Sequence, residues 1–239
     1  MTTFGLIGYP LEHSFSKKYF EQKFKDENIS GVKYTNIETE KLETLFENNL
    51  LSELSGFNVT IPFKESIIQF LDEIDASAKE INAVNCVKRV NGKLIGYNTD
   101  HIGFTESIKP LLKKSHKKAL VLGSGGASKA IIYALKSLNI DCQVVSRKSD
   151  FNYKSLDRKT IDSHQIIINC TPLGTFPDIN TFPTIPFEYL SENHLLYDLV
   201  YNPEVTEFLK KGKHYNCKTK NGLEMLQIQA EKSYIIWSN

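Results

Sequence analysis

The stretch that decides the fold is KALVLGSGGASKAIIYALKSL, residues 118–138. It opens with an apolar run at 119–122, which a cluster of glycines and small residues follows at 123–128. Small and apolar residues then recur at the three-and-four spacing of one helix face, at Ala127, Ala130, Ile131, Ala134, Leu135 and Leu138. The stretch therefore predicts a buried strand, a tight turn and an amphipathic helix.

A strand, a glycine turn and a helix in this order open a nucleotide-binding βαβ unit. Gly123 and Gly125 permit the sharp turn and a close approach of the backbone to a pyrophosphate, and the N–H groups at the helix start favour its negative charge. Ser128, where the fingerprint usually has Gly or Ala, is still small. The alternative is a glycine-rich turn with no ligand. The candidate cofactor-binding residues are Gly123, Ser124, Gly125, Gly126 and Ala127.

Strands and helices alternate after this unit, with strands expected at 140–146, 165–169 and 195–200. This alternation predicts an α/β fold with a mostly parallel, doubly wound Rossmann-type sheet from about 103 to 220. A final amphipathic helix is expected at 223–237.

The chain before residue 103 predicts a second α/β region. We expect a strand at 3–8, a helix at 17–27 capped by Ser16, a strand at 32–37 and a helix at 40–51. A further strand from 56 is stopped by Pro62, which can serve as the first residue of the next helix, and its polar Asn58 and Thr60 favour an edge facing a cleft. Asn91-Gly92 predicts a hairpin between 83–90 and 93–97.

Composition is ordinary for a soluble globular protein: 239 residues, 41% hydrophobic and 24% charged, with 29 basic against 28 acidic side chains and a formal net charge of +1. This balance predicts neither a nucleic-acid nor a membrane partner. Four widely spaced cysteines predict buried thiols in a reducing compartment, with no disulfide frame and no metal site. With no signal-peptide pattern and no run long enough to span a bilayer, we expect a cytoplasmic protein.

Basic residues follow the second strand of the nucleotide unit. Ser146, Arg147 and Lys148 stand where an NAD-binding fold usually offers a carboxylate to the ribose, so they favour the 2′-phosphate of NADP. The alternative is a solvated turn. The loop at 169–174, with Thr171 and Pro172, is expected beside the ribose or nicotinamide, with a structural turn as its alternative.

Several motifs, in order along the chain, together resemble the shikimate dehydrogenase family. Ser14 and Ser16 match its serine pair, and residues 58–64, NVTIPFK, match its substrate-domain signature. Residues 83–85 match its A-V-N segment and residues 98–100 its N-T-D motif. The resemblance continues through 123–128, 169–174, 201–203 and 222–230, and so covers essentially the whole chain.

The resemblance implies roles for individual residues. The substrate would be 3-dehydroshikimate, reduced reversibly to shikimate with NADPH in the synthesis of chorismate and the aromatic amino acids. Lys64 would donate the proton, and Asp100 would orient Lys64. Ser14 and Ser16 would bind the carboxylate of the substrate. Other substrate contacts would come from Asn58, Thr60, Asn85, Tyr201 and Gln229. Gly222 would join the cofactor site.

The family layout also implies two domains in a monomer or homodimer. Residues 1–102, completed by 221–239, would bind the substrate, and residues 103–220 would bind NADP. The chain departs from the family at Cys86, Asn221, Ser146 and Phe151, the last two in the cofactor motif. The alternatives are a quinate-using dehydrogenase, a methylenetetrahydrofolate dehydrogenase of the same layout, and a dinucleotide-sensing protein without turnover.

Overall fold

The computed structural model describes residues 1–12, 14–147 and 149–239. Its internal contacts divide the chain into two compact units. Unit 1 comprises Met1–Thr99 with Gln229–Asn239, and unit 2 comprises Asp100–Ile228. The chain returns to unit 1 at Gln229, within the last helix, whereas the sequence placed that return at residue 221.

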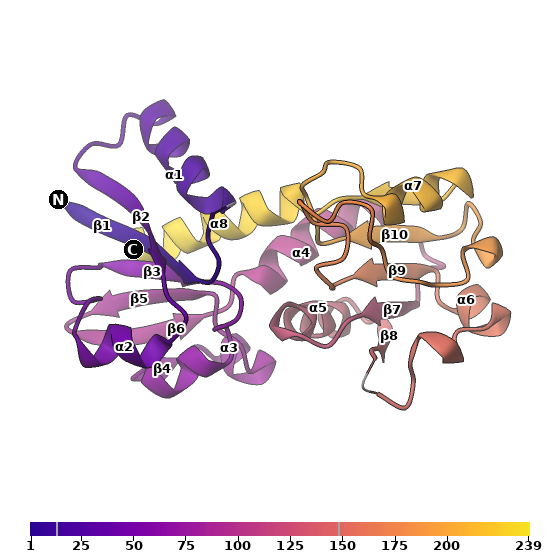
Figure 1. Ribbon diagram of the computed structural model, residues 1–239, viewed down its shortest axis with the longest axis horizontal. Coiled ribbons are helices and arrows are strands. Elements are labelled where there is room, and N and C mark those ends of the chain that lie inside the picture. Colours follow the sequence, from indigo (N-terminus) through magenta and orange to yellow (C-terminus); the bar gives the residue numbers. More distant parts are fainter. Residues whose placement is uncertain (13, 148) are drawn as a thin grey trace. The chain divides into compact units, whose positions relative to one another are not determined.

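Unit 1 is built on a mixed sheet in the order β2-β1-β3-β5-β6-β4 (Figure 1). β1 pairs in parallel with β2 and β3, while β3, β5 and β6 are joined by antiparallel pairs. The strands are β1 (Thr2–Gly8), β2 (Val32–Glu38), β3 (Gly56–Val59), β4 (Glu73–Ile74), β5 (Cys86–Val90) and β6 (Lys93–Tyr97). The helices are α1 (Phe15–Asp26), α2 (Leu42–Glu47), the 3-10 helix η1 (Ser66–Phe70), α3 (Ala76–Ile81) and the end of α8 (Leu223–Ser238).

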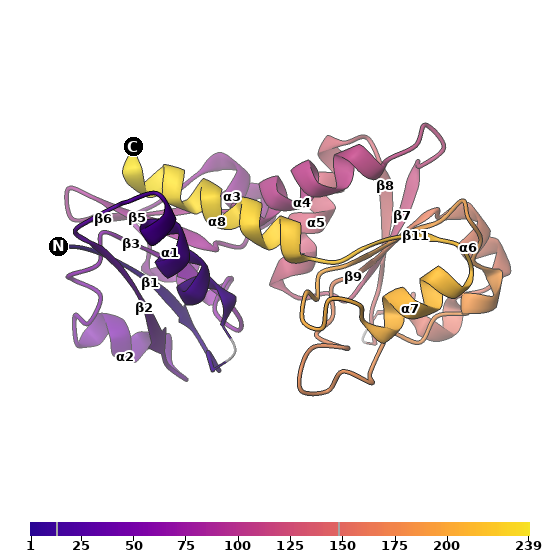
Figure 2. The same ribbon diagram turned by 90° about the horizontal axis from the view of Figure 1, so that it is seen from above.

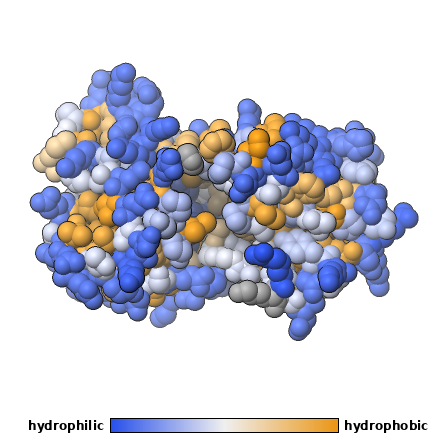
Figure 3. Space-filling view, viewed as in Figure 1, coloured by the Kyte–Doolittle hydropathy of each residue, from blue (hydrophilic) through white to orange (hydrophobic). Residues whose placement is uncertain are grey.

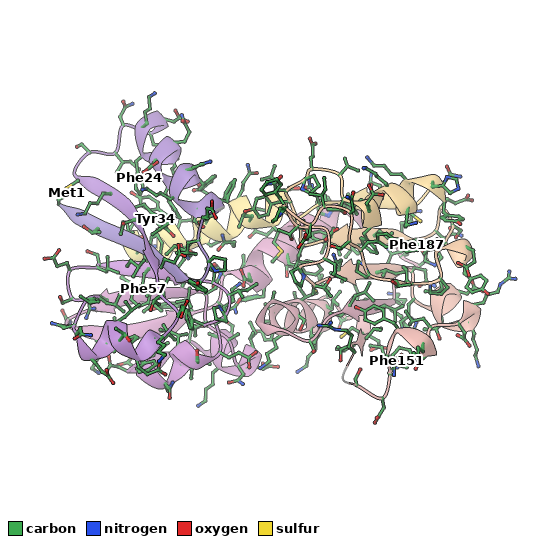
Figure 4. All side chains as sticks on the ribbon, in the orientation of Figure 1. Met1, Phe24, Tyr34, Phe57, Phe151 and Phe187 are labelled. Atoms are coloured by element: carbon green, nitrogen blue, oxygen red, sulfur yellow. The ribbon has the colours of Figure 1, made fainter. Side chains whose placement is uncertain are left out.

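The two faces of this sheet bury different clusters. Phe57 points into an aliphatic cluster with residues of α2, η1 and α3. Tyr34 and Phe24 belong to the aromatic cluster on the other face, where α1 and α8 pack (Figure 4). There Trp237 of α8 stacks on Phe4 at 4.5 Å between ring centroids, and its Nε1 donates to the carbonyl of Val87 at 2.9 Å. The last helix therefore completes the core of unit 1.

The structure corrects several expectations in unit 1. Helix α1 begins at Phe15 with Ser14 at its N-cap, so Ser16 lies in the first turn and caps nothing. β3 is an interior strand, with β1 on one side and β5 on the other, so the prediction of an edge strand was wrong. A turn follows Pro62, and the next helix is the short η1; no helix begins at this proline. Helix α2 covers only part of the expected 40–51.

Unit 2 has an all-parallel sheet in the order β11-β10-β9-β7-β8. Figure 2 labels β11, β9, β7 and β8 of this sheet. The strands are β7 (Lys118–Leu122), β8 (Asp141–Val145), β9 (Ile166–Asn169), β10 (Leu195–Asp198) and β11 (Lys218–Lys220). The helices are α4 (Asp100–Ile108), η2 (Lys109–Leu111), α5 (Gly126–Ser137), η3 (Tyr153–Ser155), α6 (Arg158–Ser163), η4 (Phe187–Tyr189) and α7 (Glu207–His214). Residues of α4 and α5 share one buried cluster, and residues of α6 and α7 share another.

This sheet is doubly wound, as the sequence predicted. After β8 the chain crosses to β9 on the opposite side of β7, so the strand order reverses between β7 and β9. In such sheets a ligand binds outside the carboxyl ends of the strands at the reversal. The ends of β7 and β9 carry the glycine cluster and the loop at 169–174, which places both predicted cofactor segments at this point.

The predicted hairpin is confirmed. The hairpin of β5 and β6 turns at Asn91 and Gly92, with φ values of 50° and 84°. Within the described residues, all four cysteines are free, no helix is long and apolar enough to cross a membrane, and no group of side chains is suited to hold a metal ion. Hydrophilic side chains predominate on the face in Figure 3, and apolar ones are exposed only in small groups.

We predict that Trp237→Ala will lower the free energy of unfolding by about 3–5 kcal/mol, the usual cost of removing a buried tryptophan. Trp237 is 7% exposed, and a side chain at Gly56 would collide with it, so its packing is close. Ile235→Ala is the control, because Ile235 lies on the same helix but is 49% exposed and should change stability by about 0.5 kcal/mol or less. Urea denaturation followed by circular dichroism measures both. Equal losses in the two variants would contradict the role of α8 in this core.

Candidate functional site

A network of buried amide and hydroxyl side chains crosses the α1–α8 face of unit 1. Asn58 Nδ2 donates to the carbonyl of Asn85 at 3.0 Å and to Ser233 Oγ at 2.9 Å. Ser233 Oγ lies 3.1 Å from Thr99 Oγ1 and donates to the carbonyl of Gln229 at 2.9 Å. Each of these residues is buried, so the network compensates the desolvation of its own polar atoms.

Asn85 connects this network to the N-T-D segment. Its Oδ1 accepts from the backbone N–H of Thr99 at 2.6 Å, and its Nδ2 donates to Thr99 Oγ1 at 3.0 Å and to Gln229 Oε1 at 3.2 Å. Asn98 Nδ2 donates to the carbonyl of Ala83 at 2.9 Å. The chain just before Asp100 is therefore fixed by bonds within unit 1. The structure brings together Asn58, Asn85 and Gln229 from the predicted substrate residues.

Tyr34 extends the network toward α1. Its hydroxyl donates to Asn58 Oδ1 at 2.9 Å and is also hydrogen-bonded by Ser16. Burial raises the pKa of Tyr34 well above its usual value, and the bond from Ser16 opposes that shift. Ser16 is thus linked through Tyr34 to Asn58. Sequence reasoning missed Tyr34 and Ser233, because nothing in their local pattern distinguishes them from core residues.

Ser14 differs from its neighbour Ser16. Its Oγ is buried and has no hydrogen-bond partner in the part of the chain that the structure describes, so Ser14 occupies the N-cap position of α1 without a side-chain capping bond. Leaving a buried hydroxyl unsatisfied costs about 1–3 kcal/mol, so such an atom calls for an explanation. A ligand that accepts or donates a hydrogen bond at this position provides one.

The remaining substrate-side residues come from separate places. Thr60 and Lys64 lie in the partly exposed turn after β3, where the carbonyl of Lys64 accepts from the N–H of Val84 at 2.7 Å. Asp100 is buried and is the first residue of unit 2. Tyr201, also in unit 2, is partly exposed after β10. The joint action of Lys64 and Asp100 stays a prediction.

The glycine turn of unit 2 fits an anion. Gly123 has a φ of +108°, and an added Cβ there would lie 3.0 Å from Thr171 Cγ2. Gly125 is the N-cap of α5 and has open space where a Cβ would be. Within the described chain, no acceptor is paired with the N–H groups of residues 124–127, which lie at the positive end of the helix. These donors and the open space fit the pyrophosphate of a dinucleotide.

The end of β8 carries the predicted phosphate-binding residues. Arg147 is exposed, and Lys148 lies outside the described residues. Ser146 is buried, and its Oγ donates to Ser149 Oγ at 3.1 Å. Phe151, which stands in place of a basic residue of the family motif, packs against the core of unit 2. Among the described residues at the end of β8, Arg147 is therefore the exposed cationic side chain that a phosphate could reach.

The loops after β9 and β10 are joined by buried side chains. Asn169 Oδ1 accepts from the N–H of Thr171 at 2.9 Å and from its Oγ1 at 2.6 Å, whereas Pro172 is exposed. Asn169 Nδ2 donates to Asp198 Oδ1 at 2.9 Å. Sequence reasoning missed Asp198, although an acidic residue inside the apolar run 195–200 was a signal. Gly222 needs no special ligand to explain it, because a Cβ there would lie 2.1 Å from the carbonyl oxygen of Leu199.

Fold and site together define the class of this protein as a dinucleotide-binding protein with a site for a small polar molecule. One unit has an anion-binding turn at the reversal of a doubly wound sheet, and the other has amide and hydroxyl side chains suited to a hydroxylated small molecule.

Comparison with known proteins identifies the family. Residues 6–87 match the family model described as the shikimate dehydrogenase substrate binding domain. A shikimate dehydrogenase (NADP(+)) of Methanococcus vannielii is 38% identical, over 98% of this chain and 90% of that protein. The chain belongs to the shikimate dehydrogenase family.

Solved structures agree with this assignment. The shikimate dehydrogenase of Aquifex aeolicus is 35% identical with a TM-score of 0.88, covering 99% of this chain and 92% of that one. The enzyme of Thermus thermophilus, solved with NADP(H) and shikimate, is 30% identical with a TM-score of 0.88, covering 100% of this chain and 94% of that one. The predicted family, fold class and NADP cofactor are confirmed.

We predict that Gly125→Ala will weaken NADPH binding at least about tenfold and lower stability by at most about 1 kcal/mol. The φ of Gly125 is −84° and its surroundings are open, so an added methyl group meets only the space that the cofactor needs. Gly123→Ala is the contrasting variant, because its positive φ and the nearby Thr171 should cost about 1–3 kcal/mol of stability. Fluorescence titration with NADPH and thermal unfolding measure the two effects. Wild-type affinity in Gly125→Ala would contradict the site.

Proposed function

We propose that this chain catalyses the reversible reduction of 3-dehydroshikimate to shikimate with NADPH. The observation that carries the proposal is the buried network of Asn58, Asn85, Thr99, Gln229 and Ser233, because a ring with several hydroxyl groups needs both donors and acceptors. Membership of the shikimate dehydrogenase family supports the same substrate.

The proposed roles divide between the two units. NADPH, when bound, supplies the hydride to the ketone carbon. The N–H groups at 124–127 would hold its pyrophosphate, Arg147 and Lys148 would favour its 2′-phosphate, and Ser146, Thr171, Pro172 and Gly222 would complete that site. Lys64 donates the proton that the ketone oxygen needs to become a hydroxyl, and Asp100 orients the lysine.

The proposed substrate contacts are hydroxyl and amide side chains. Ser14 Oγ, buried without a partner in the described chain, binds the substrate carboxylate together with Ser16. Gln229 Oε1 accepts from Asn85 Nδ2 at 3.2 Å, and we assign the Gln229 amide to a ring hydroxyl because Gln229 matches the substrate-binding glutamine of the family. Asn58 already donates both amide hydrogens within the protein, so it can only accept from the substrate through Oδ1. Thr60 and Tyr201 add hydroxyl groups.

The same proposal includes the setting of the enzyme. We infer a cytoplasmic protein, active as a monomer or homodimer, whose partners are its substrate and cofactor and include no nucleic acid. The free cysteines and the near-zero net charge support this setting. A substrate panel tests the reaction. With 3-dehydroshikimate as the substrate, NADPH should be oxidised fast and NADH slowly. NADP-dependent oxidation of quinate that matched that of shikimate would favour a quinate/shikimate dehydrogenase.

We predict that Ser14→Ala will raise KM for the substrate by roughly ten- to a hundredfold, the value of about 1.5–3 kcal/mol for a hydrogen bond to a charged group. Because no described partner is lost, stability should stay the same or rise slightly. Ser16→Ala provides the comparison: it also removes the bond to Tyr34 and should lower the thermal midpoint. Steady-state kinetics and thermal unfolding give both readouts. An unchanged KM in Ser14→Ala would remove this serine from the substrate site.

We predict that Lys64→Ala will lower kcat by about a hundred- to ten-thousandfold while KM changes far less, as expected for loss of a general acid. Asp100→Asn keeps the shape and removes the charge. If the two residues share one step, the double variant should be little worse than the more damaged single variant. Losses that multiply would show that Asp100 acts elsewhere, and near-normal turnover in Lys64→Ala would defeat the assignment.

A further inference from the structure

Asp198, at the end of β10, is a fully buried carboxylate that joins separate segments of unit 2. Its Oδ1 accepts from Asn169 Nδ2 at 2.9 Å and from the backbone N–H of Val200 at 3.0 Å. Its Oδ2 accepts from Thr206 Oγ1 at 2.6 Å, and Thr206 is the N-cap of α7. The carboxylate thus ties the end of β9, the loop after β10 and the start of α7 to one point.

The charge of Asp198 has no basic partner among the described residues. Burial raises its pKa to about 6, and the hydrogen bonds from Thr206, Val200 and Asn169 oppose that shift. At neutral pH the group is therefore mainly an ionised carboxylate, which accepts hydrogen bonds and donates none. An asparagine of the same shape would present one acceptor oxygen and a donor. The site thus suits a group with two acceptor oxygens.

An acceptor at this position fixes the orientation of the Asn169 amide. Nδ2 of Asn169 must face Asp198, so Oδ1 faces the opposite way and accepts both the N–H and the hydroxyl of Thr171. Thr171 in turn lies against the glycine turn, since its Cγ2 is 3.0 Å from where a Cβ of Gly123 would be. The orientation set by Asp198 therefore reaches the loop that borders the anion-binding turn.

We propose that Asp198 is a positioning residue for the cofactor, which holds Thr171 in place through Asn169. The proposal rests on the proposed function in taking NADPH as the ligand of this edge of the sheet. Asp198 is buried and reaches the loop at 169–174 through the side chain of Asn169. Its replacement should therefore weaken cofactor binding without weakening the binding of the substrate.

Binding measurements on the whole protein test this proposal without turnover. Asp198→Asn should weaken NADPH binding, measured by fluorescence titration, by roughly fivefold or more, while the Kd for shikimate, measured by calorimetry, stays within about twofold of wild type. Thr171→Val removes the hydroxyl at the end of the relay. If Asp198 acts through it, Asp198→Asn should have much less effect in that background than alone.

A matched pair at Thr206 keeps the test usable if Asp198→Asn does not fold. Thr206→Val removes the hydroxyl that donates to Asp198, whereas Thr206→Ser retains it, so only the valine variant should weaken NADPH binding. An unchanged NADPH Kd with a lowered thermal midpoint would overturn the proposal and leave a purely structural role. The proposal would also be overturned if the effects of Asp198→Asn and Thr171→Val on the Kd for NADPH multiplied in the double variant. A wild-type protein that binds NADPH but does not reduce 3-dehydroshikimate would overturn the proposed function and leave this comparison intact.

Discussion

The hydrogen bond from Asn58 Nδ2 to Ser233 Oγ is the contact on which the substrate side of this protein depends. Asn58 lies on an interior strand, where water cannot satisfy its amide, and its partner comes from the last helix of the chain. Pairing of this buried amide, together with the packing of Trp237, holds α8 against the sheet of unit 1. Gln229 and Trp237 are carried with it, so the same helix supplies a candidate substrate ligand and part of the core.

Order within this network has a consequence for binding. Amide side chains that are already bonded to one another lose little further freedom when a substrate arrives, so less of the binding energy is spent on ordering them. Thr99 carries that order to the next residue of the chain, because its N–H and hydroxyl are both held by Asn85. Bonds within unit 1 thus fix the backbone next to Asp100, whose carboxylate is the group proposed to orient Lys64.

The parts of this structure that could be predicted from the sequence obey local rules. Asn91-Gly92 requires positive φ values, and Gly123 requires one as well, so the hairpin and the nucleotide turn follow from short segments. The errors arose where residues far away in the sequence determine the environment of a side chain. Asn58 was expected at an edge because its partners, Tyr34 and Ser233, are distant in the sequence. The family motifs identified the candidate site more completely than local physics did, yet they did not contain the residues that support it.

The supporting residues use opposite chemistry in the two units. Around Asn58 and Thr99 the groups are neutral and can both donate and accept, which suits a site for hydroxyl groups that must do the same. At the reversal of the parallel sheet the support is Asp198, an acceptor alone, which permits a single orientation of the Asn169 amide. The carboxylate of Asp198 accepts from Asn169, Val200 and Thr206, so its oxygens are occupied by donors within unit 2. The N–H groups of the glycine turn are the donors left to face the anion.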